Sequence, residues 1–143
     1  MILDTNMKRE IILDNYQYPS HKGLKGGAGY QKAHMASDSC IDDITVEAKI
    51  EGDKIIDINF DGVACSLSTA STSIMCQMLI GKSVEDARYF IEQYNNMIFE
   101  KEYDSDILEE LNAFDQLHKQ ANRIKCGTIG FRGLTQILDE REK

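Results

Sequence analysis

The spacing of apolar residues changes from two to about 3.6 near Gly62, and this change limits the fold more than any other feature. Before Gly62, apolar and polar residues alternate over residues 44–50 and again over residues 56–60, as expected for half-buried strands. Residues 51–54 between them predict the tight reversal of a β-hairpin. Residues 30–36 are interpreted as a third strand.

After Gly62 the apolar residues follow helical spacing. They form four stripes, within residues 67–79, 84–98, 107–117 and 127–138. Ser83, with Asp86 three residues later, is typical of a helix start, and a short helix over residues 8–16 should end by Pro19. Strands followed by helices predict an α+β fold, a small antiparallel sheet of about three strands with a packed set of helices, in a single domain spanning residues 1–143.

The segment from His21 to Gly29 contains four glycines. A phosphate-binding loop would need a closing Gly-Lys-Ser/Thr and a preceding apolar strand, and neither is present in the sequence. We therefore expect a flexible connector here.

The charge and the N-terminus exclude several classes. With 16 basic and 24 acidic residues the formal charge is −8, which disfavours nucleic-acid binding and fits contact with a protein partner. The first residues contain neither a signal nor a transit peptide, and no stretch is long enough to span a membrane. We therefore expect a cytoplasmic protein, in which the four cysteines favour metal binding or thiol chemistry over disulfides.

Three of the cysteines lie at the ends of expected elements. Cys40 precedes the first hairpin strand, Cys65 follows the second, and Cys126 begins the last helix. Together with Asp42 they offer enough ligands for a tetrahedral zinc ion. Their spacing matches no local zinc motif, so burial in the core is the alternative. Two expected helix N-termini, at Cys65 and Cys126, favour thiolates and so favour the metal.

Other candidate ligands have simpler interpretations. Cys76 would lie about 16 Å from Cys65 along one helix, too far to share a metal, and should pack in the core. None of the histidines, His21, His34 and His118, stands beside a cysteine, so none is assigned as a ligand. The acidic run over residues 100–110 could attract a basic partner, but a solvated helix start is the simpler interpretation.

Four motifs suggest a family. They are LDNYQYPSHKG (residues 13–23), GVACSLSTASTSIM (62–75), GKSVEDA (81–87) and RIKCGTIGFRGL (123–134). With them the chain resembles the IscU/NifU-like iron–sulfur cluster assembly family over nearly its whole length. It is most similar to the SufU branch, because Lys125 stands where IscU-type members carry histidine and because residues 96–120 resemble the additional stretch of SufU-type members.

The resemblance implies a metal site of Cys40, Asp42, Cys65 and Cys126, with zinc bound and Cys40 as the sulfur acceptor. It implies a sulfur carrier that takes persulfide sulfur from a cysteine desulfurase, a pyridoxal-phosphate enzyme of the SufS type, and serves downstream iron–sulfur assembly proteins. One alternative is a scaffold that assembles and transfers a [2Fe–2S] cluster. Ile41 and Ala64 replace glycines that are usual in the family, and they support a further alternative, a metal-free interaction protein.

Overall fold

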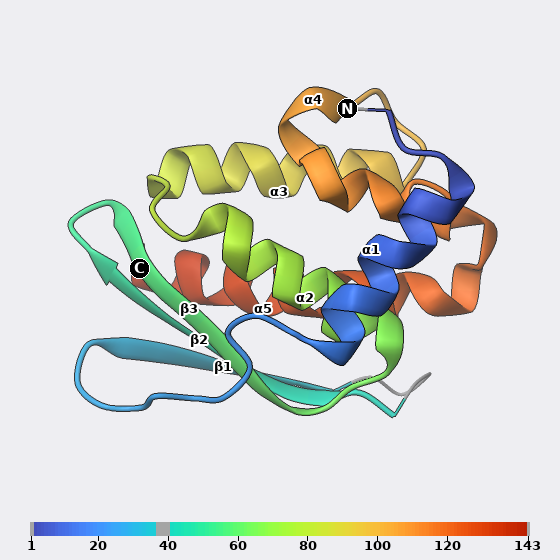
Figure 1. Ribbon diagram of the computed structural model, residues 1–143. Helices are drawn as coiled ribbons and strands as arrows, with labels where there is room; N and C mark the ends of the chain where they lie inside the picture. The colour runs from blue at the N-terminus through green and yellow to red at the C-terminus, as the bar shows by residue number, and fades with distance from the viewer. Residues whose placement is uncertain (1, 37–40, 143) are drawn as a thin grey trace.

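The computed structural model describes residues 2–36 and 41–142. Three strands, β1 (Tyr30–Ala36), β2 (Asp43–Glu51) and β3 (Lys54–Val63), form an antiparallel sheet in the order β1-β2-β3 (Figure 1). The strand over residues 30–36 and the hairpin that follows are thus confirmed. The free edge of β3 is covered by two loops, since Gly23 N–H donates to Phe60 O and Ile55 N–H donates to Lys82 O.

Helices lie on one face of this sheet, which confirms the predicted α+β class (Figure 1). The α-helices are α1 (Thr5–Gln17), α2 (Ser66–Leu79), α3 (Val84–Ile98), α4 (Ser105–Leu108) and α5 (Ile124–Arg141). Helices α2 and α5 pack on the sheet and on each other, and α3 lies beyond them. In the described part of the chain, no helix is both long enough and apolar enough to cross a membrane.

The segment expected to form one helix over residues 107–117 is instead broken into short turns. Helix α4 has only four residues and is followed by the 3-10 segments η1 (Glu109–Phe114), η2 (Leu117–Lys119) and η3 (Ala121–Arg123). The break falls at Glu109, whose φ of 45° no continuous helix allows. The apolar residues of this segment are buried as predicted, namely Leu108, Leu111, Phe114 and Leu117. The predicted apolar stripe is therefore confirmed, whereas the prediction of one regular helix is wrong.

A β-bulge changes which isoleucine of β3 enters the core. The pairing of β2 with β3 shifts between Lys49 and Ile50, so β3 has one extra residue at this point. Ile55 is therefore fully buried, whereas Ile56, expected in the core, is 41% exposed. Beyond the bulge, Ile58 and Phe60 face the helices as predicted.

The outer face of the sheet contains a buried polar cluster instead of a solvated row. Glu47, Asp57 and Asn59 are buried there, and the glycine-rich segment folds over them. Glu47 accepts the backbone N–H groups of Lys25 and Gly26 at 2.9 and 3.1 Å. The segment predicted to be a flexible connector is thus fixed to the sheet by a carboxylate, because a buried charge must find donors.

Asp57 receives three further donors in this cluster. Lys25 Nζ and Asn59 Nδ2 each lie 2.9 Å from its Oδ2, which also accepts the hydroxyl of Tyr30. Burial alone would raise the pKa of Asp57, but the hydrogen bonds from Tyr30, Lys25 and Asn59 outweigh it and lower the pKa to about 2. The hydrogen bond to Asp57, together with burial, raises the pKa of Tyr30 to about 12.

Asp57→Asn should destabilise the protein at about pH 6 by roughly 1–3 kcal/mol, because three donors lose a charged acceptor. The folded-state pKa lies below the ordinary value of 3.8, so the contribution of Asp57 is complete above that value and is lost as the pH falls toward about 2. Urea unfolding of wild type and variant should therefore converge in this range. Asp61→Asn, on the same strand, is the control, and a gap independent of pH would contradict the assignment.

Candidate metal centre

Three predicted ligands meet where β2, α2 and α5 begin. Asp42 directly precedes β2, Cys65 is the N-cap of α2, and Cys126 is in the first turn of α5. One oxygen of Asp42 and the Sγ atoms of Cys65 and Cys126 all lie within 4.8 Å of one another. Asp42 and Cys126 are buried, and Cys65 is partly exposed. The fold thus brings together residues that no local motif connects.

Gly62 allows Asp42 to reach Cys65. Its φ is 126°, and a Cβ atom at this position would lie only 2.2 Å from the carbonyl oxygen of Asp43 and 2.9 Å from the Cα of Ile44. Only glycine permits the paired strands β2 and β3 to approach each other this closely. This close approach places the start of β2 next to the start of α2, which follows β3 after two intervening residues.

The carboxylate of Asp42 is held by α2. Its Oδ1 accepts the backbone N–H of Cys65 at 2.8 Å, and its Oδ2 accepts the hydroxyl of Ser68. The same Ser68 Oγ lies 3.3 Å from Cys65 Sγ. Because the fully buried Ser68 hydroxyl contacts both side chains, it orients two candidate ligands at once. Each carboxylate oxygen keeps a second lone pair with which it can bind a cation.

Two arginines offset the negative charge of these ligands. Arg123 Nη2 lies 3.7 Å from Cys65 Sγ, so this cation lies beside the Cys65 thiol. The side chain of Arg132 turns back along α5 and donates from Nη2 to Lys125 O at 2.9 Å. Burial lowers the pKa of Arg132, against the opposite effect of the charges of Asp42 and Cys126, which places its guanidinium near both.

The donor set fits a thiophilic divalent ion such as zinc. Zinc–sulfur bonds of about 2.3 Å place tetrahedral ligand atoms about 3.8 Å apart, and the observed group is already gathered within a similar span. Two sulfurs and one oxygen leave one position for a further ligand. Cys40, the predicted fourth ligand, lies outside the residues that the structure describes.

The residues excluded by sequence reasoning stay outside this group. Cys76 is fully buried in the core, and burial raises the pKa of its thiol. Each histidine lies against a carboxylate: His21 against Asp57, His34 against Asp43, and His118 against Glu100. The cluster of candidate ligands found among the described residues contains neither Cys76 nor a histidine.

Sequence reasoning missed Ser68 and Arg132. Ser68 lies three residues after Cys65, a spacing that puts both at the same helix end, and this signal was available. Arg132 lies six residues after Cys126, which does not place two side chains on one helix face. Only the backward course of its long side chain brings the charge to the site, and sequence spacing does not show this.

The fold and this ligand group define a class of protein. The family model of the NifU-like N-terminal domain matches residues 7–126, and the chain belongs to this family. This finding confirms the IscU/NifU-like resemblance of the four motifs.

Two curated relatives show where in the family the chain lies. It is 34% identical to the zinc-dependent sulfurtransferase SufU of Bacillus subtilis (strain 168), over 98% of this chain and 94% of that protein. It is 31% identical to the iron–sulfur cluster assembly scaffold protein IscU of Streptococcus pyogenes serotype M1, over 90% of this chain and 80% of that protein. The higher identity and coverage are those of the SufU relative, as the SufU-type resemblance predicted.

A solved structure supports the same assignment. It is the crystal structure of a putative iron–sulfur cluster assembly scaffold protein for the SUF system from Fervidobacterium islandicum AW-1. It superposes with a TM-score of 0.79 at 28% identity, covering 90% of this chain and 94% of that one. The predicted fold family is therefore confirmed in structure as well as in sequence.

Ser68→Ala should weaken zinc binding by roughly tenfold to a hundredfold, because an oriented hydrogen bond to a ligand is lost. Competition with a chromophoric chelator measures this affinity. Ser71→Ala is the matched control, since Ser71 is equally buried on α2 but donates only to the backbone carbonyl of Ser68. Equal zinc affinities for the two variants would show that Ser68 does not orient the ligands.

Proposed function

We propose that this protein is a zinc-dependent sulfur carrier that accepts persulfide sulfur from a cysteine desulfurase for iron–sulfur cluster assembly. The observation that carries the proposal is the convergence of Asp42, Cys65 and Cys126 at the ends of three elements. Membership of the NifU-like family and the similarity to the zinc-dependent sulfurtransferase SufU of Bacillus subtilis support it.

Cys40, Asp42, Cys65 and Cys126 are the residues proposed to hold the metal. Bound zinc would keep the cysteines as thiolates at neutral pH. The N-termini of α2 and α5 favour the same thiolates at Cys65 and Cys126, since the positive end of a helix dipole attracts negative charge. Arg123 adds a cation at Cys65 Sγ.

The proposed reaction is a transfer of sulfane sulfur to Cys40. The Cys40 thiolate attacks the terminal sulfur of the desulfurase cysteine persulfide, and a new S–S bond forms on Cys40. The S–S bond of the donor breaks, and the donor cysteine leaves as a thiolate. The electrons balance without an external oxidant or reductant, and this chain leaves as the Cys40 persulfide.

Asp42 gives the proposed ligand set its asymmetry. It is a single oxygen donor among sulfurs, and both of its oxygens already accept hydrogen bonds from α2. It therefore stays with α2 when another ligand leaves. Cys40 precedes it in the chain and is the acceptor assigned by the family resemblance, so we propose that Cys40 is the ligand released on docking.

The donor partner is proposed to be a pyridoxal-phosphate desulfurase of the SufS type, acting in the cytoplasm with downstream iron–sulfur assembly proteins as acceptors. The whole of residues 1–143 would act as one domain. A chain of formal charge −8 suits docking to a protein with a complementary basic surface.

A second candidate function is assembly and transfer of a [2Fe–2S] cluster. The 31% identity to the IscU scaffold of Streptococcus pyogenes favours it, as does the oxygen ligand, which would hold a cluster less firmly than a fourth thiolate. Metal analysis and a visible spectrum of anaerobically purified protein separate the candidates, because zinc is colourless and the cluster is not.

Cys40→Ala should abolish acceptance of ³⁵S from a persulfide-loaded SufS-type desulfurase, because the attacking thiolate is gone. Gel analysis under non-reducing conditions measures the label on this chain. Cys76→Ala is the matched control and should accept the label like wild type, since Cys76 is a buried core residue.

Two outcomes would overturn the proposal. Labelled sulfur on Cys40→Ala at the wild-type level would remove Cys40 from the reaction. Wild-type protein that holds far less than one metal ion, and whose unfolding is unchanged by a strong chelator, would favour the metal-free interaction protein.

A further inference from the structure

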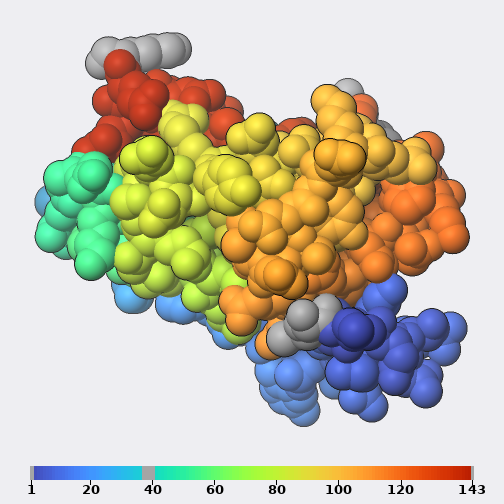
Figure 2. Space-filling view, turned by 90° about the horizontal axis from the view of Figure 1, so that it is seen from above, coloured from blue at the N-terminus to red at the C-terminus, as the bar shows by residue number. Residues whose placement is uncertain are grey.

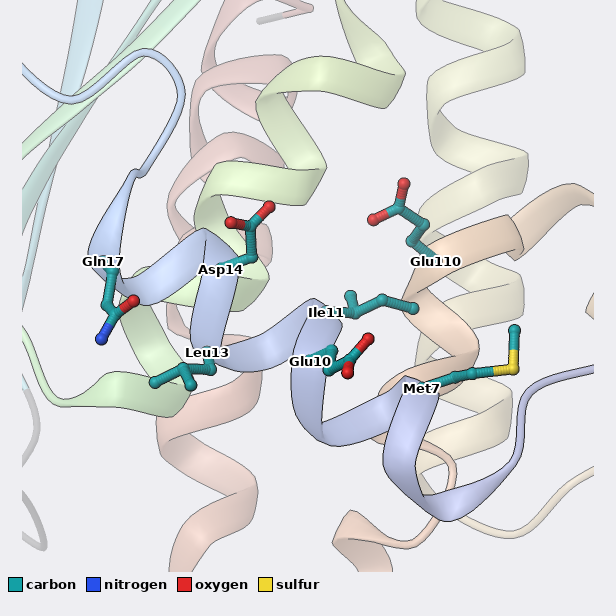
Figure 3. Close-up of a pocket in the computed structure, with 7 residues that line it drawn as sticks. All are labelled: Met7, Glu10, Ile11, Leu13, Asp14, Gln17 and Glu110. Atoms are coloured by element: carbon teal, nitrogen blue, oxygen red, sulfur yellow. The ribbon is translucent and has the colours of Figure 1, made fainter.

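A groove separate from the metal centre runs between α1 and η1. Its volume is about 520 Å³, within the range of sites that bind ligands. The lining residues are Met7, Glu10, Ile11, Leu13, Asp14 and Gln17 of α1, with Glu110 of η1. Figure 3 shows Ile11 extending from α1 toward η1, with Asp14 and Glu110 on either side of the space beside it. None of these residues belongs to the candidate metal centre.

The groove exists because α1 is attached at its two ends. Toward its C-terminus, Asn15 Oδ1 accepts hydrogen bonds of 2.9 Å from Ser73 Oγ and Gln77 Nε2 of α2. Near its N-terminus, Lys8 Nζ pairs with Asp115, which follows η1, at 2.9 Å. Between these attachments the helix lies beside η1, along one edge of the molecule (Figure 2).

Apolar side chains remain exposed along this groove. Leu13 is 53% exposed and Met7 is 43% exposed, whereas Asn15 of the same helix is buried. Ile11 is half-buried and packs against the core cluster with its inner side. The groove therefore offers apolar surface that a partner could remove from water.

The charges that line the groove are all negative. Glu10, Asp14 and Glu110 are exposed, and no lysine, arginine or histidine lines the groove. Within residues 2–36 and 41–142, the structure records no ion pair or side-chain hydrogen bond for these three carboxylates. By contrast, the neighbouring acid Asp115 is paired with Lys8. The groove thus gathers acids that lack a cation of their own.

We propose that this groove is the docking site for a basic amphipathic helix of a protein partner. Glu10 and Asp14 are four residues apart on one face of α1, so their carboxylates can pair with cations one turn apart on a facing helix. Glu110 offers a third carboxylate from the opposite wall. Met7 and Ile11, also four residues apart on this face, accept the apolar face of the same segment, as in other helix-in-groove complexes. A small polycation would use the acids and leave the apolar surface wet.

The test uses the full-length protein and a lysine/leucine amphipathic peptide of about 15 residues as the probe. The triple variant Glu10→Gln/Asp14→Asn/Glu110→Gln removes the groove charges. Its matched control, Glu51→Gln/Glu92→Gln/Glu102→Gln, removes three exposed acids outside the groove. Affinity is measured by fluorescence anisotropy, and the contact surface by amide shift changes in ¹⁵N-labelled protein. Met7→Gln tests the apolar part by itself.

We expect the groove variant to bind at least about tenfold more weakly and the control to change by less than about twofold. Met7→Gln should also bind more weakly, and shifts should concentrate in α1 and η1. A peptide of the same composition in non-amphipathic order should bind poorly. Equal losses in the two triple variants, or competition by spermine as effective as that by the peptide, would overturn the proposal. Zinc content is measured beside these assays, so failure here is distinct from failure of the proposed sulfur transfer.

Discussion

The close approach of α5 to its neighbours determines most of this structure. A Cβ atom on Gly130 would lie 2.4 Å from Thr72 Oγ1 of α2, and one on Gly133 would lie 2.9 Å from Val46 Cγ2 of β2. The α5 backbone is therefore itself the packing surface between helix and sheet. Tyr94 of α3 covers the other side, stacking on Phe131 at 4.2 Å and donating to Gly127 O at 2.7 Å. Because Cys126 directly precedes this contact, the packing of α5 also positions the metal centre.

Buried carboxylates on the two sides of the sheet are stabilised in the same way. Glu47 on the outer face and Asp42 at the helix side each accept backbone N–H groups from a neighbouring segment. In both cases the desolvation cost of a charge is offset by the hydrogen-bond donors of that segment. At Glu47 the result is an ordered glycine-rich loop. At Asp42 the result is an oriented ligand.

The sequence predicted those parts of the fold that depend on local periodicity. The hairpin strands and three of the four helices expected after Gly62 follow from apolar spacing, and the structure confirms them. The failures come from long-range contacts. Ile56 is exposed because of a bulge in pairing with β2, and the regular helix over residues 107–117 is broken at Glu109, where φ is 45°. For the site, the ends of expected elements and the family resemblance named Asp42, Cys65 and Cys126, but their convergence, and the contributions of Ser68 and Arg132, needed the three-dimensional fold.

The order of the ligands along the chain has a consequence for unfolding. Asp42 and Cys65 are 23 residues apart, and Cys126 belongs to the last helix. An ion shared by these residues would act as a topological cross-link that ties the hairpin to the C-terminal helix and shortens the loops of the unfolded chain. The loaded protein would then open as one unit, whereas release of a single ligand would free one loop and leave the others tied. Exchange of one ligand could thus change the local mobility of the chain without unfolding the domain.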